Sequence, residues 1–261
     1  MAGCIPRLAA VTNLHPELRP SAEPLAIPER VLAIGAHPDD VEFGAAGTLA
    51  KWADAGAEVT IAVVTDGSKG TWDPAADPAL LVATRRSEQR SAAAVIGAAG
   101  VRFAEHIDGE LEYSMDLRAE MCRWIRELRP DVVLTHDPWQ RYQLHPDHRV
   151  TGIAVADGVV AARDHHFFPA QAASGLAPHR PGALLLWSAD EPNHWEEVSS
   201  SLERKIEALL LHESQSVTTM GGAAAEAGAR QAFADRIRSR AADAGAPAGL
   251  SAAEAFRRLT P

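Results

Sequence analysis

Near its amino end the chain reads Val31-Leu32-Ala33-Ile34-Gly35-Ala36-His37-Pro38-Asp39-Asp40. The first five residues form an unbroken apolar run that ends in glycine, which is typical of a buried strand of a parallel sheet. Polar side chains follow directly, and open α/β sheets place their sites at the carboxyl ends of their strands. This stretch therefore predicts an α/β fold with a functional site at the end of its first strand.

The side chains of this first motif suit a divalent metal ion. His37 and Asp40 supply an imidazole nitrogen and a carboxylate oxygen, and their i, i+3 spacing brings both to one side of a turn that Pro38 stiffens. Asp39 then points elsewhere. A carboxylate beside a metal but not bound to it can take a proton from water, so we predict that Asp39 is a general base.

A second histidine-acid motif lies roughly a hundred residues further on and reads His145-Pro146-Asp147-His148. It follows another apolar strand, 132–135, by about ten residues. Two histidines three apart can share one face, so one can complete the metal set while the other faces a substrate carbonyl. Such a set leaves a coordination position open, as catalytic zinc sites do. The alternative is that these histidines are surface or capping residues.

Strand and helix patterns alternate along the chain. We expect strands at 31–35, 58–64, 101–105, 131–135 and 183–187, and helices at 45–55, 84–99, 117–128, 146–163 and 198–212. This order predicts a Rossmann-like α/β fold, in which a mostly parallel sheet carries helices on both faces in three layers.

We divide the chain into a short arm and one domain. Residues 1–28 contain five prolines and only short apolar runs, which predicts an N-terminal arm that is either mostly extended, packing on the domain or a neighbouring subunit, or disordered. Residues 29–261 form a single domain whose Ala-rich C-terminal segment, 218–261, is expected to be helical on either side of a break at 245–249. Its apolar residues should anchor it on the domain or on a partner subunit, which leaves a homo-oligomer open: Phe233, Ile237, Leu250 and Phe256.

The composition narrows the choice of partner and compartment. A net charge of −10 argues against nucleic acid, because binding phosphates requires a basic surface. No segment reads as a membrane span or a secretion signal. Cys4 and Cys122 make no disulfide framework and have no metal-like spacing. We therefore expect a cytoplasmic protein that acts on a small molecule.

Three further motifs accompany the first two. They are Thr65-Asp66-Gly67, Arg85-x-x-Glu88 and, late in the chain, Lys205 with His212-Glu213-Ser214-Gln215. In this order and spacing the set resembles the LmbE-like (PIG-L) family of metal-dependent N-deacetylases, which remove acetyl groups from N-acetylglucosamine-type sugars and related conjugates. The resemblance runs from about residue 30 to about residue 215.

The resemblance implies a role for each residue of the two histidine motifs. His37, Asp40 and His148 would hold the metal, usually Zn²⁺, although Fe²⁺ suits the same ligands. Asp39 would be the base that activates water, and His145 would stabilise the oxyanion and protonate the leaving amine.

Substrate binding is assigned to four residues: Arg85, Asp66, Trp72 and Tyr142. The resemblance suggests Arg85, whose alternative role is an ion pair with Glu88 one helical turn away. Asp66 could position a loop over the site or simply form an Asp-Gly turn. Trp72 could stack on a sugar ring or serve as a hydrophobic anchor.

Tyr142 lies three residues before the second motif's first histidine, one position further away than in relatives that use a tyrosine there. It could therefore line the pocket or pack. Two more histidines lie near the motifs. His136 is interpreted as structural, and His212 could support the site from behind or brace the end of a helix.

Three functions of different classes follow. The leading hypothesis is a zinc-dependent hydrolase that removes an acyl group, in the first instance acetyl, from a small N-acetylglucosamine-type conjugate. The second is a metal-dependent amidase acting on a thiol conjugate or another N-acylated secondary metabolite, with the same ligands and a different pocket. The third is a non-catalytic metal- or sugar-binding protein. Asp39 disfavours the third, because a base beside an open metal site has no use in binding.

Overall fold

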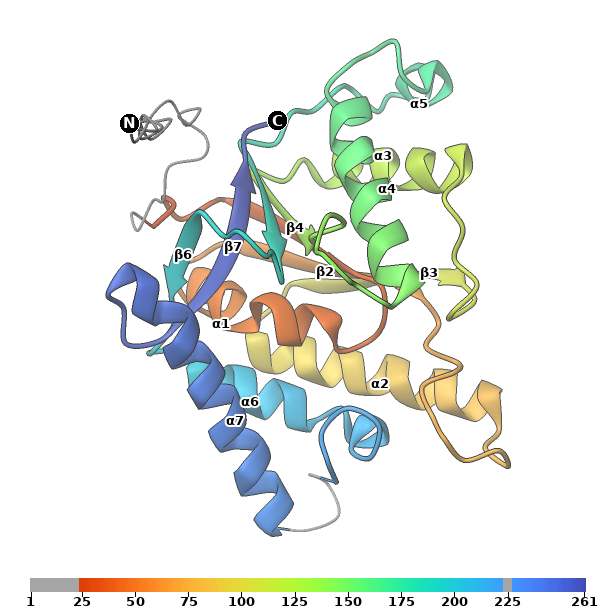
Figure 1. Cartoon of the computed structure of the whole chain (residues 1–261). Coiled ribbons are helices and arrows are strands. Elements are labelled where there is room, and N and C mark those ends of the chain that lie inside the picture. The colour runs from red at the N-terminus through yellow and green to blue at the C-terminus, as the bar shows by residue number, and fades with distance from the viewer. Residues whose placement is uncertain (1–23, 223–226) are drawn as a thin grey trace, which may run out of the picture.

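The computed structural model describes residues 24–222 and 227–261. Most of the expected N-terminal arm, 1–28, lies outside these residues. The described chain builds one seven-stranded sheet in the order β3-β2-β1-β4-β5-β7-β6 (Figure 1). Its strands are β1 (Arg30–Gly35), β2 (Glu58–Thr65), β3 (Gly100–His106), β4 (Val132–His136), β5 (Ala183–Trp187), β6 (His194–Glu197) and β7 (Ala253–Leu259).

Strands β1 to β5 pair in parallel, and β7 runs antiparallel between β5 and β6. The mostly parallel α/β sheet predicted from the sequence is thus confirmed. The chain leaves β1 towards β2 and β3 on one side and later returns to β4 and β5 on the other. The order reverses between β1 and β4, and such a switch point is where open α/β sheets bind ligands.

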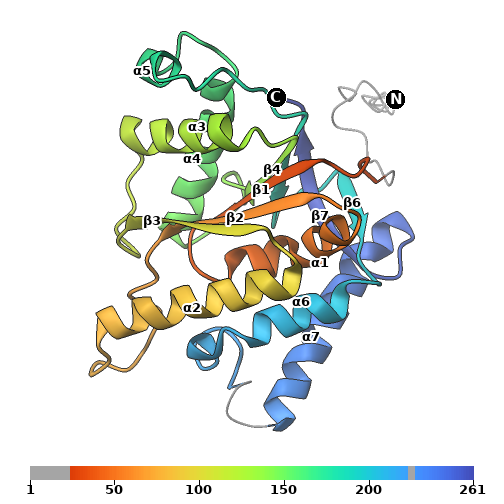
Figure 2. The same cartoon turned by 180° about the vertical axis from the view of Figure 1, so that it is seen from behind.

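Helices cover both faces of the sheet, as Figures 1 and 2 show from opposite sides. One face carries α1 (Asp40–Asp54), α2 (Pro78–Ile96), α6 (Leu202–Leu210) and α7 (Ala227–Gly245). The other carries α3 (Met115–Leu128), α4 (Pro146–Ala162) and the short α5 (Pro169–Ala173). Alternate residues of the central strands enter two apolar clusters on opposite faces, which is why these strands are apolar throughout.

Two helices begin earlier than their apolar patterns suggest. Helix α1 starts at Asp40 and includes part of the first motif, and α2 starts at Pro78 after Asp77, whose carboxylate accepts hydrogen bonds from the N–H groups of Ala79 and Leu80. Proline at the first helical position is favourable because no hydrogen-bond donor is lost there. Helix α1 opens with the polar residues of the motif, and residues 78–83 of α2 are apolar throughout and largely exposed, so neither turn shows the helical alternation of apolar and polar residues.

The expectation of a second C-terminal helix is wrong. After α7 the chain passes through a short turn at Ala246–Ala248 and then forms strand β7. Phe233, Ile237 and Phe256 are buried as expected, but Phe256 lies on this strand, and Leu250 is only half-buried. The alanine bias favours helix locally, whereas pairing with β5 and β6 supplies hydrogen bonds from residues far away in sequence.

The helices of the described residues include none that combines the length and the apolar character of a membrane span.

Candidate active site

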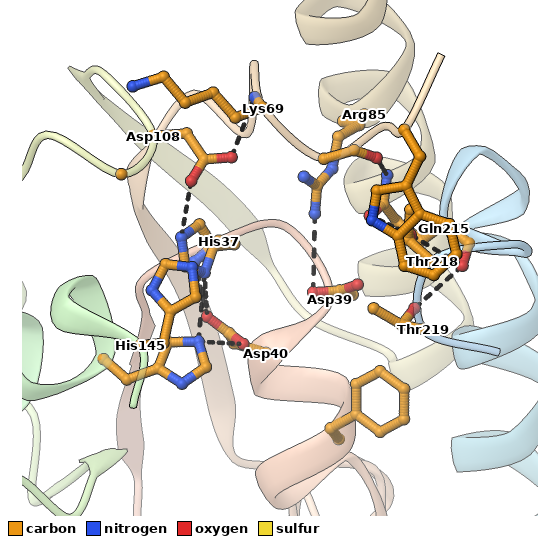
Figure 3. Close-up of a pocket in the computed structure, with 15 residues that line it drawn as sticks. His37, Asp39, Asp40, Lys69, Arg85, Asp108, His145, Gln215, Thr218 and Thr219 are labelled. Atoms are coloured by element: carbon orange, nitrogen blue, oxygen red, sulfur yellow. Dashed lines mark hydrogen bonds and ion pairs between the residues drawn. The ribbon is translucent and has the colours of Figure 1, made fainter. Parts of the chain in front are cut away.

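The two histidine motifs meet at the switch point of the sheet. The first lies in the turn between β1 and α1, and the second forms the start of α4. Together they line a cavity of about 610 Å³ (Figure 3). Its wall consists of His37, Asp39, Asp40, Phe43, Lys69, Gly70, Trp72, Arg85, Asp108, Gly109, His145, His148, Gln215, Thr218 and Thr219.

The three predicted metal ligands come together in this cavity. His37 Nδ1 lies 3.2 Å from Asp40 Oδ2 and 3.2 Å from His148 Nε2. His148 Nε2 lies 3.2 Å from Asp40 Oδ1. Ligand atoms that share a tetrahedral zinc ion are about 3.3–3.5 Å apart. The donor set and its spacing therefore fit a small divalent cation.

Two carboxylates fix the orientation of the His37 ring from the other side. Its Nε2 lies 3.1 Å from Asp108 Oδ1 and 3.1 Å from Asp147 Oδ2. Because ionised carboxylates only accept hydrogen bonds, Nε2 carries the ring proton and the Nδ1 lone pair is left for a cation. Burial alone would lower the pKa of His37, but its bonds to Asp108, Asp147 and Asp40 raise that pKa well above its usual value, so without an ion Nδ1 also carries a proton, which a bound cation would displace.

Asp40 is held on its far side by His136. The indole N–H of Trp187 donates to His136 Nδ1 at 3.1 Å, which leaves the ring proton on Nε2. That nitrogen lies 3.2 Å from Asp40 Oδ2, so it donates to the carboxylate; the N–H of Ala36, 3.2 Å from the same nitrogen, is then only a close contact. Burial lowers the pKa of His136 to about 4, so this ring is neutral.

The carboxylate of Asp40 is the more acidic of the two neighbouring aspartates. Burial would raise the pKa of Asp40, but the neighbouring imidazoles of His148 and His136 and their hydrogen bonds hold it well below its usual value. Asp40 is therefore ionised in the folded protein, as a metal ligand must be.

Asp39 has different surroundings. Only 5 % of the residue is exposed, and its Oδ1 lies 3.7 Å from Arg85 Nη2. Within the described chain, Asp39 Oδ2 has no hydrogen-bond partner although it is buried at the cavity. Burial raises the pKa of Asp39 to about 6, and the charge of Arg85 opposes this shift. A buried carboxylate with a free oxygen can accept a proton from water in the cavity.

The backbone of Asp39 is strained. Its φ is 104° and its ψ is −22°, in the left-handed region, which costs a residue with a side chain on the order of 1–3 kcal/mol. Strain of this kind persists only where neighbouring groups determine the conformation, and it concentrates at functional sites.

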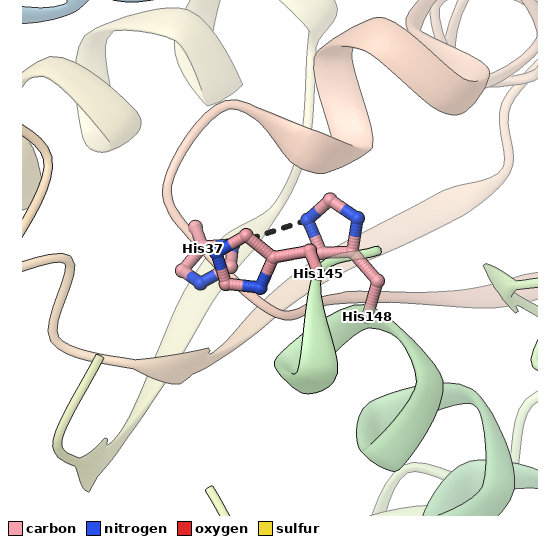
Figure 4. Close-up of side chains that lie close together, drawn as sticks. All are labelled: His37, His145 and His148. Carbon is pink, nitrogen blue, oxygen red and sulfur yellow. Dashed lines mark hydrogen bonds between the residues drawn. The ribbon is translucent and has the colours of Figure 1, made fainter. Parts of the chain in front are cut away.

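His145 lies at the cavity between the other two imidazoles (Figure 4). Its ring stacks on that of His148 with centroids 4.7 Å apart and meets the edge of His37 at 4.5 Å. Among the described residues its buried Nδ1 has no hydrogen-bond partner. Burial lowers the pKa of His145, and His37 and His148 lower it further. Its roles as oxyanion donor and acid stay predictions.

The residues predicted to bind substrate divide into two pairs. Arg85 and Trp72 line the cavity, with Trp72 74 % exposed and Arg85 almost fully buried. Asp66 and Tyr142 are not in its wall. Asp66 Oδ1 accepts hydrogen bonds from the N–H groups of Ser68 and Asp108 and so shapes the loops, and Tyr142 is 88 % exposed. Substrate contact by all four stays a prediction.

Arg85 and Glu88 do not form the ion pair considered from their spacing. Arg85 donates to the carbonyl oxygens of Pro38 and Gly67, whereas Glu88 accepts from both the N–H and the hydroxyl of Ser214. The two motif residues on α2 therefore connect this helix to different loops.

Sequence reasoning missed several residues around the site. Asp108, in the loop after β3, bears no recognisable motif, and Gln89 is one polar residue among many on α2. Gln89 does lie four residues after Arg85, on the same helix face, which was the available signal. His136, interpreted as structural, contacts a predicted metal ligand.

Comparison with known proteins finds a matching family and similar sequences. The sequence model of the PIG-L family, described as GlcNAc-PI de-N-acetylase, matches residues 32–159. A diacetylchitobiose deacetylase of Thermococcus kodakarensis is 35 % identical over 193 residues, which cover 74 % of this chain and 72 % of the relative. A probable N-acetyl-α-D-glucosaminyl L-malate deacetylase of Bacillus anthracis is 29 % identical, with 72 % and 82 % covered.

A solved structure extends the similarity beyond the family match. The N,N′-diacetylchitobiose deacetylase of Pyrococcus horikoshii superposes with a TM-score of 0.81 and 30 % sequence identity, covering 89 % of this chain and 84 % of that one. The fold of this chain is thus shared with a deacetylase. The chain belongs to the PIG-L (LmbE-like) family.

Proposed function

We propose that this protein is a zinc-dependent N-deacetylase that acts on a small N-acetylglucosamine-type conjugate. The observation that carries the proposal is the site itself: three ligand side chains that approach one another pairwise to 3.2 Å, beside the buried carboxylate of Asp39, which has one unpartnered oxygen within the described structure. An open metal position next to a base is the arrangement of a metal-assisted hydrolase.

His37, Asp40 and His148 would hold the ion, and Fe²⁺ suits the same three ligands. When bound, such an ion lowers the pKa of water from about 15.7 towards about 7 and polarises the amide carbonyl. Asp108 and Asp147 keep the ring of His37 in the required tautomer, and His136 orients the carboxylate of Asp40.

Asp39 and His145 perform the proton and charge chemistry. Asp39 Oδ2 takes a proton from the water that attacks the amide carbon. His145 donates a hydrogen bond to the oxygen that becomes negative in the tetrahedral intermediate. The amide C–N bond then breaks, the proton passes to the leaving amine, and the acetyl group departs as acetate.

The cavity supports a sugar conjugate as substrate. Its volume of about 610 Å³ falls within the range of small-ligand pockets. Trp72 offers an exposed ring that can lie against the apolar face of a sugar, and polar groups surround the rest of the cavity. The named relatives act on N-acetylated glucosamine compounds, which is why acetyl is the acyl group proposed.

The test is amine release from a panel of N-acetylated compounds: N-acetylglucosamine, diacetylchitobiose, an N-acetylglucosaminyl malate and an N-acetylated amino acid. We expect amine and acetate in equal amounts from one or more of the sugars, and loss of the activity on chelation with recovery on adding zinc. Protein that binds zinc but releases amine from none of the sugars would contradict the proposal.

A further inference from the structure

The peptide bond that joins Pro38 to Asp39 is held on both of its polar sides by one helix. Arg85 Nη2 on α2 donates to the carbonyl oxygen of Pro38 at 2.6 Å. The N–H of Asp39 donates to Gln89 Oε1 at 3.0 Å. Residues four apart lie on the same helix face, so α2 presents both side chains to this one peptide.

This contact controls where the Asp39 side chain points. The plane of the Pro38–Asp39 peptide, together with the direction of α1, sets the φ of Asp39 at 104°. A residue with a side chain does not adopt this value without support. Gln89 is fully buried, so removing its oxygen would leave the Asp39 N–H without a partner and allow the peptide to rotate.

Gln89 is itself oriented by a charged group. Its Nε2 donates to Glu42 Oε1, which belongs to α1 and is fully buried. Because a carboxylate only accepts, the amide must turn its NH₂ towards Glu42 and its oxygen towards Asp39. The ring of His212, also fully buried, lies 3.6 Å from the other oxygen of Glu42. The orientation of the Gln89 amide is therefore determined by the buried pair behind it.

The Thr65-Asp66-Gly67 motif supports Arg85 from the opposite side. Arg85 Nη1 donates to the carbonyl oxygen of Gly67 at 3.0 Å. A Cβ at Gly67 would lie 2.8 Å from that same nitrogen, and the φ of Gly67 is 69°. Glycine at this position thus lets the loop close over the guanidinium group, which in turn holds the carbonyl of Pro38.

We propose that Gln89, acting with Arg85, is a positioning residue for the base of the reaction. Its side-chain oxygen holds the Asp39 peptide in the left-handed conformation and so keeps the Asp39 carboxylate aimed at the attacking water. The inference rests on the proposed function, because it assigns Asp39 as the base. The Gln89 side chain is hydrogen-bonded to Asp39 N–H and to Glu42, neither of which is a group proposed to bind metal.

The test begins with Gln89→Leu, compared with Ser87→Leu at an exposed position of the same helix. Misplacement of a catalytic group by about 1 Å can cost about 10²-fold in rate. For Gln89→Leu we expect kcat to fall about 10²-fold with KM and bound metal unchanged. Ser87→Leu should leave kcat, KM and bound metal unchanged. Near-normal kcat in Gln89→Leu, or loss of its metal, would overturn the proposal.

A rescue experiment separates positioning from general loss of structure. In the double variant Gln89→Glu with Glu42→Gln, the amide and the carboxylate exchange places. The oxygen at position 89 can again accept from Asp39 N–H, and the amide at position 42 can donate to it. We expect the kcat of the double variant to lie within a few-fold of wild type. This comparison does not require Gln89→Leu to fold.

If the double variant folds and binds metal but its kcat is about 10²-fold below that of wild type, the proposal is overturned. The hydrogen bond from Asp39 N–H to position 89 would then not account for the fall in kcat. Wild-type protein is assayed in parallel. If wild type releases no amine, the proposed function fails; if wild type is active and the variants disagree with these expectations, only the role of Gln89 fails.

Discussion

Asp39 and Asp40 are adjacent residues with the same side chain, yet their surroundings give them different chemistry. Asp40 faces two imidazoles, which keep its pKa well below the usual value. Asp39 is buried next to a guanidinium group 3.7 Å away, and its pKa is raised to about 6. Burial raises the pKa of Asp39 and the imidazoles lower that of Asp40, and surroundings that separate the pKa values of two carboxylates are the usual basis for separate acid and base roles.

This contrast predicts different outcomes for matched substitutions. Asp39→Asn should keep bound metal and lose several orders of magnitude in kcat, because an amide cannot accept the proton of water. Asp40→Asn should instead lose metal, because it removes a charged ligand. Metal content and kcat measured on both variants check this. Equal metal loss in the two, or near-normal turnover by Asp39→Asn, would contradict the assigned roles.

His145 has a prediction of its own. His145→Ala should retain metal and lower kcat by about 10²–10³-fold, the usual cost of removing one oxyanion donor. Metal analysis with steady-state kinetics on the substrate found in the panel provides the check. If His145→Ala loses its metal, the residue is a ligand instead, which its position between His37 and His148 would permit.

At the residue scale, the sequence predicted those site residues that stand close together in short motifs. His37, Asp39, Asp40 and His148 stand in short motifs, and the structure brings them into one cavity. Asp108 and Gln89 reach the site from other elements, and their contacts depend on how those elements pack. Packing of this kind is not encoded in any short pattern.

At the scale of single elements, the end of α4 depends on a buried arginine of α3. Arg126 is 2 % exposed and donates to the carbonyl oxygens of Ala161, Ala162, Asp164 and Phe167. Ala161 and Ala162 are the last residues of α4, where carbonyls have no partner further along the helix, whereas Asp164 and Phe167 lie in the segment that follows. One guanidinium group thus joins the end of α4 to the chain that follows.

Arg126→Met should therefore lower the free energy of unfolding by about 2–4 kcal/mol, because the carbonyls at the end of α4 and in the segment that follows lose their hydrogen bonds to a buried charged group. Arg123→Met, at an exposed position of the same helix, should change it by less than about 0.5 kcal/mol. Urea denaturation of the two variants gives both values. Equal stabilities would show that water replaces the guanidinium group without cost.

Strand β6 contains a second buried charge. Glu196 is fully buried and accepts hydrogen bonds from His194, Lys51 and the N–H of Leu25. Burial would raise the pKa of Glu196, but the bonds from His194 and Lys51 hold it below its usual value of 4.5. A lowered pKa in the folded state stabilises the protein above pH 4.5, and this stability is lost as the pH falls through the folded value.

Glu196→Gln should accordingly be less stable than wild type at pH 7, and the difference should shrink as the pH falls below about 4.5. Urea denaturation between pH 7 and pH 3.5 measures this, with the exposed Glu207→Gln as the control. A stability difference that stays constant over this range would mean that the Glu196 charge does not contribute.

Element prediction succeeded where apolar runs are long and failed where partners are distant. The five parallel strands were expected near their observed positions; four of them are buried on both faces and are largely apolar, and only the edge strand β3 carries several charged residues. Strands β6 and β7 were missed. Strand β6 reads His-Trp-Glu-Glu and β7 reads Ala-Glu-Ala-Phe-Arg-Arg-Leu, so neither is an apolar run, and the pairing of β7 with β5 and β6 makes them strands.

At the scale of the whole molecule, the site results from the topology of the sheet. The first motif follows β1 and the second follows β4, and these two strands are neighbours in the sheet although about a hundred residues separate them. Parallel pairing brings their carboxyl ends to one edge. The alternation of strand and helix predicted this fold class, whereas the strand order became known only from the structure.

The most direct test of the account is reconstitution of metal-free protein with zinc, with bound metal and amine release measured on the same samples. We predict that amine release rises in proportion to bound zinc and levels off at about one ion per chain, because one set of three ligands serves one cavity. Full activity of the metal-free protein, or activity unrelated to the zinc bound, would contradict the account.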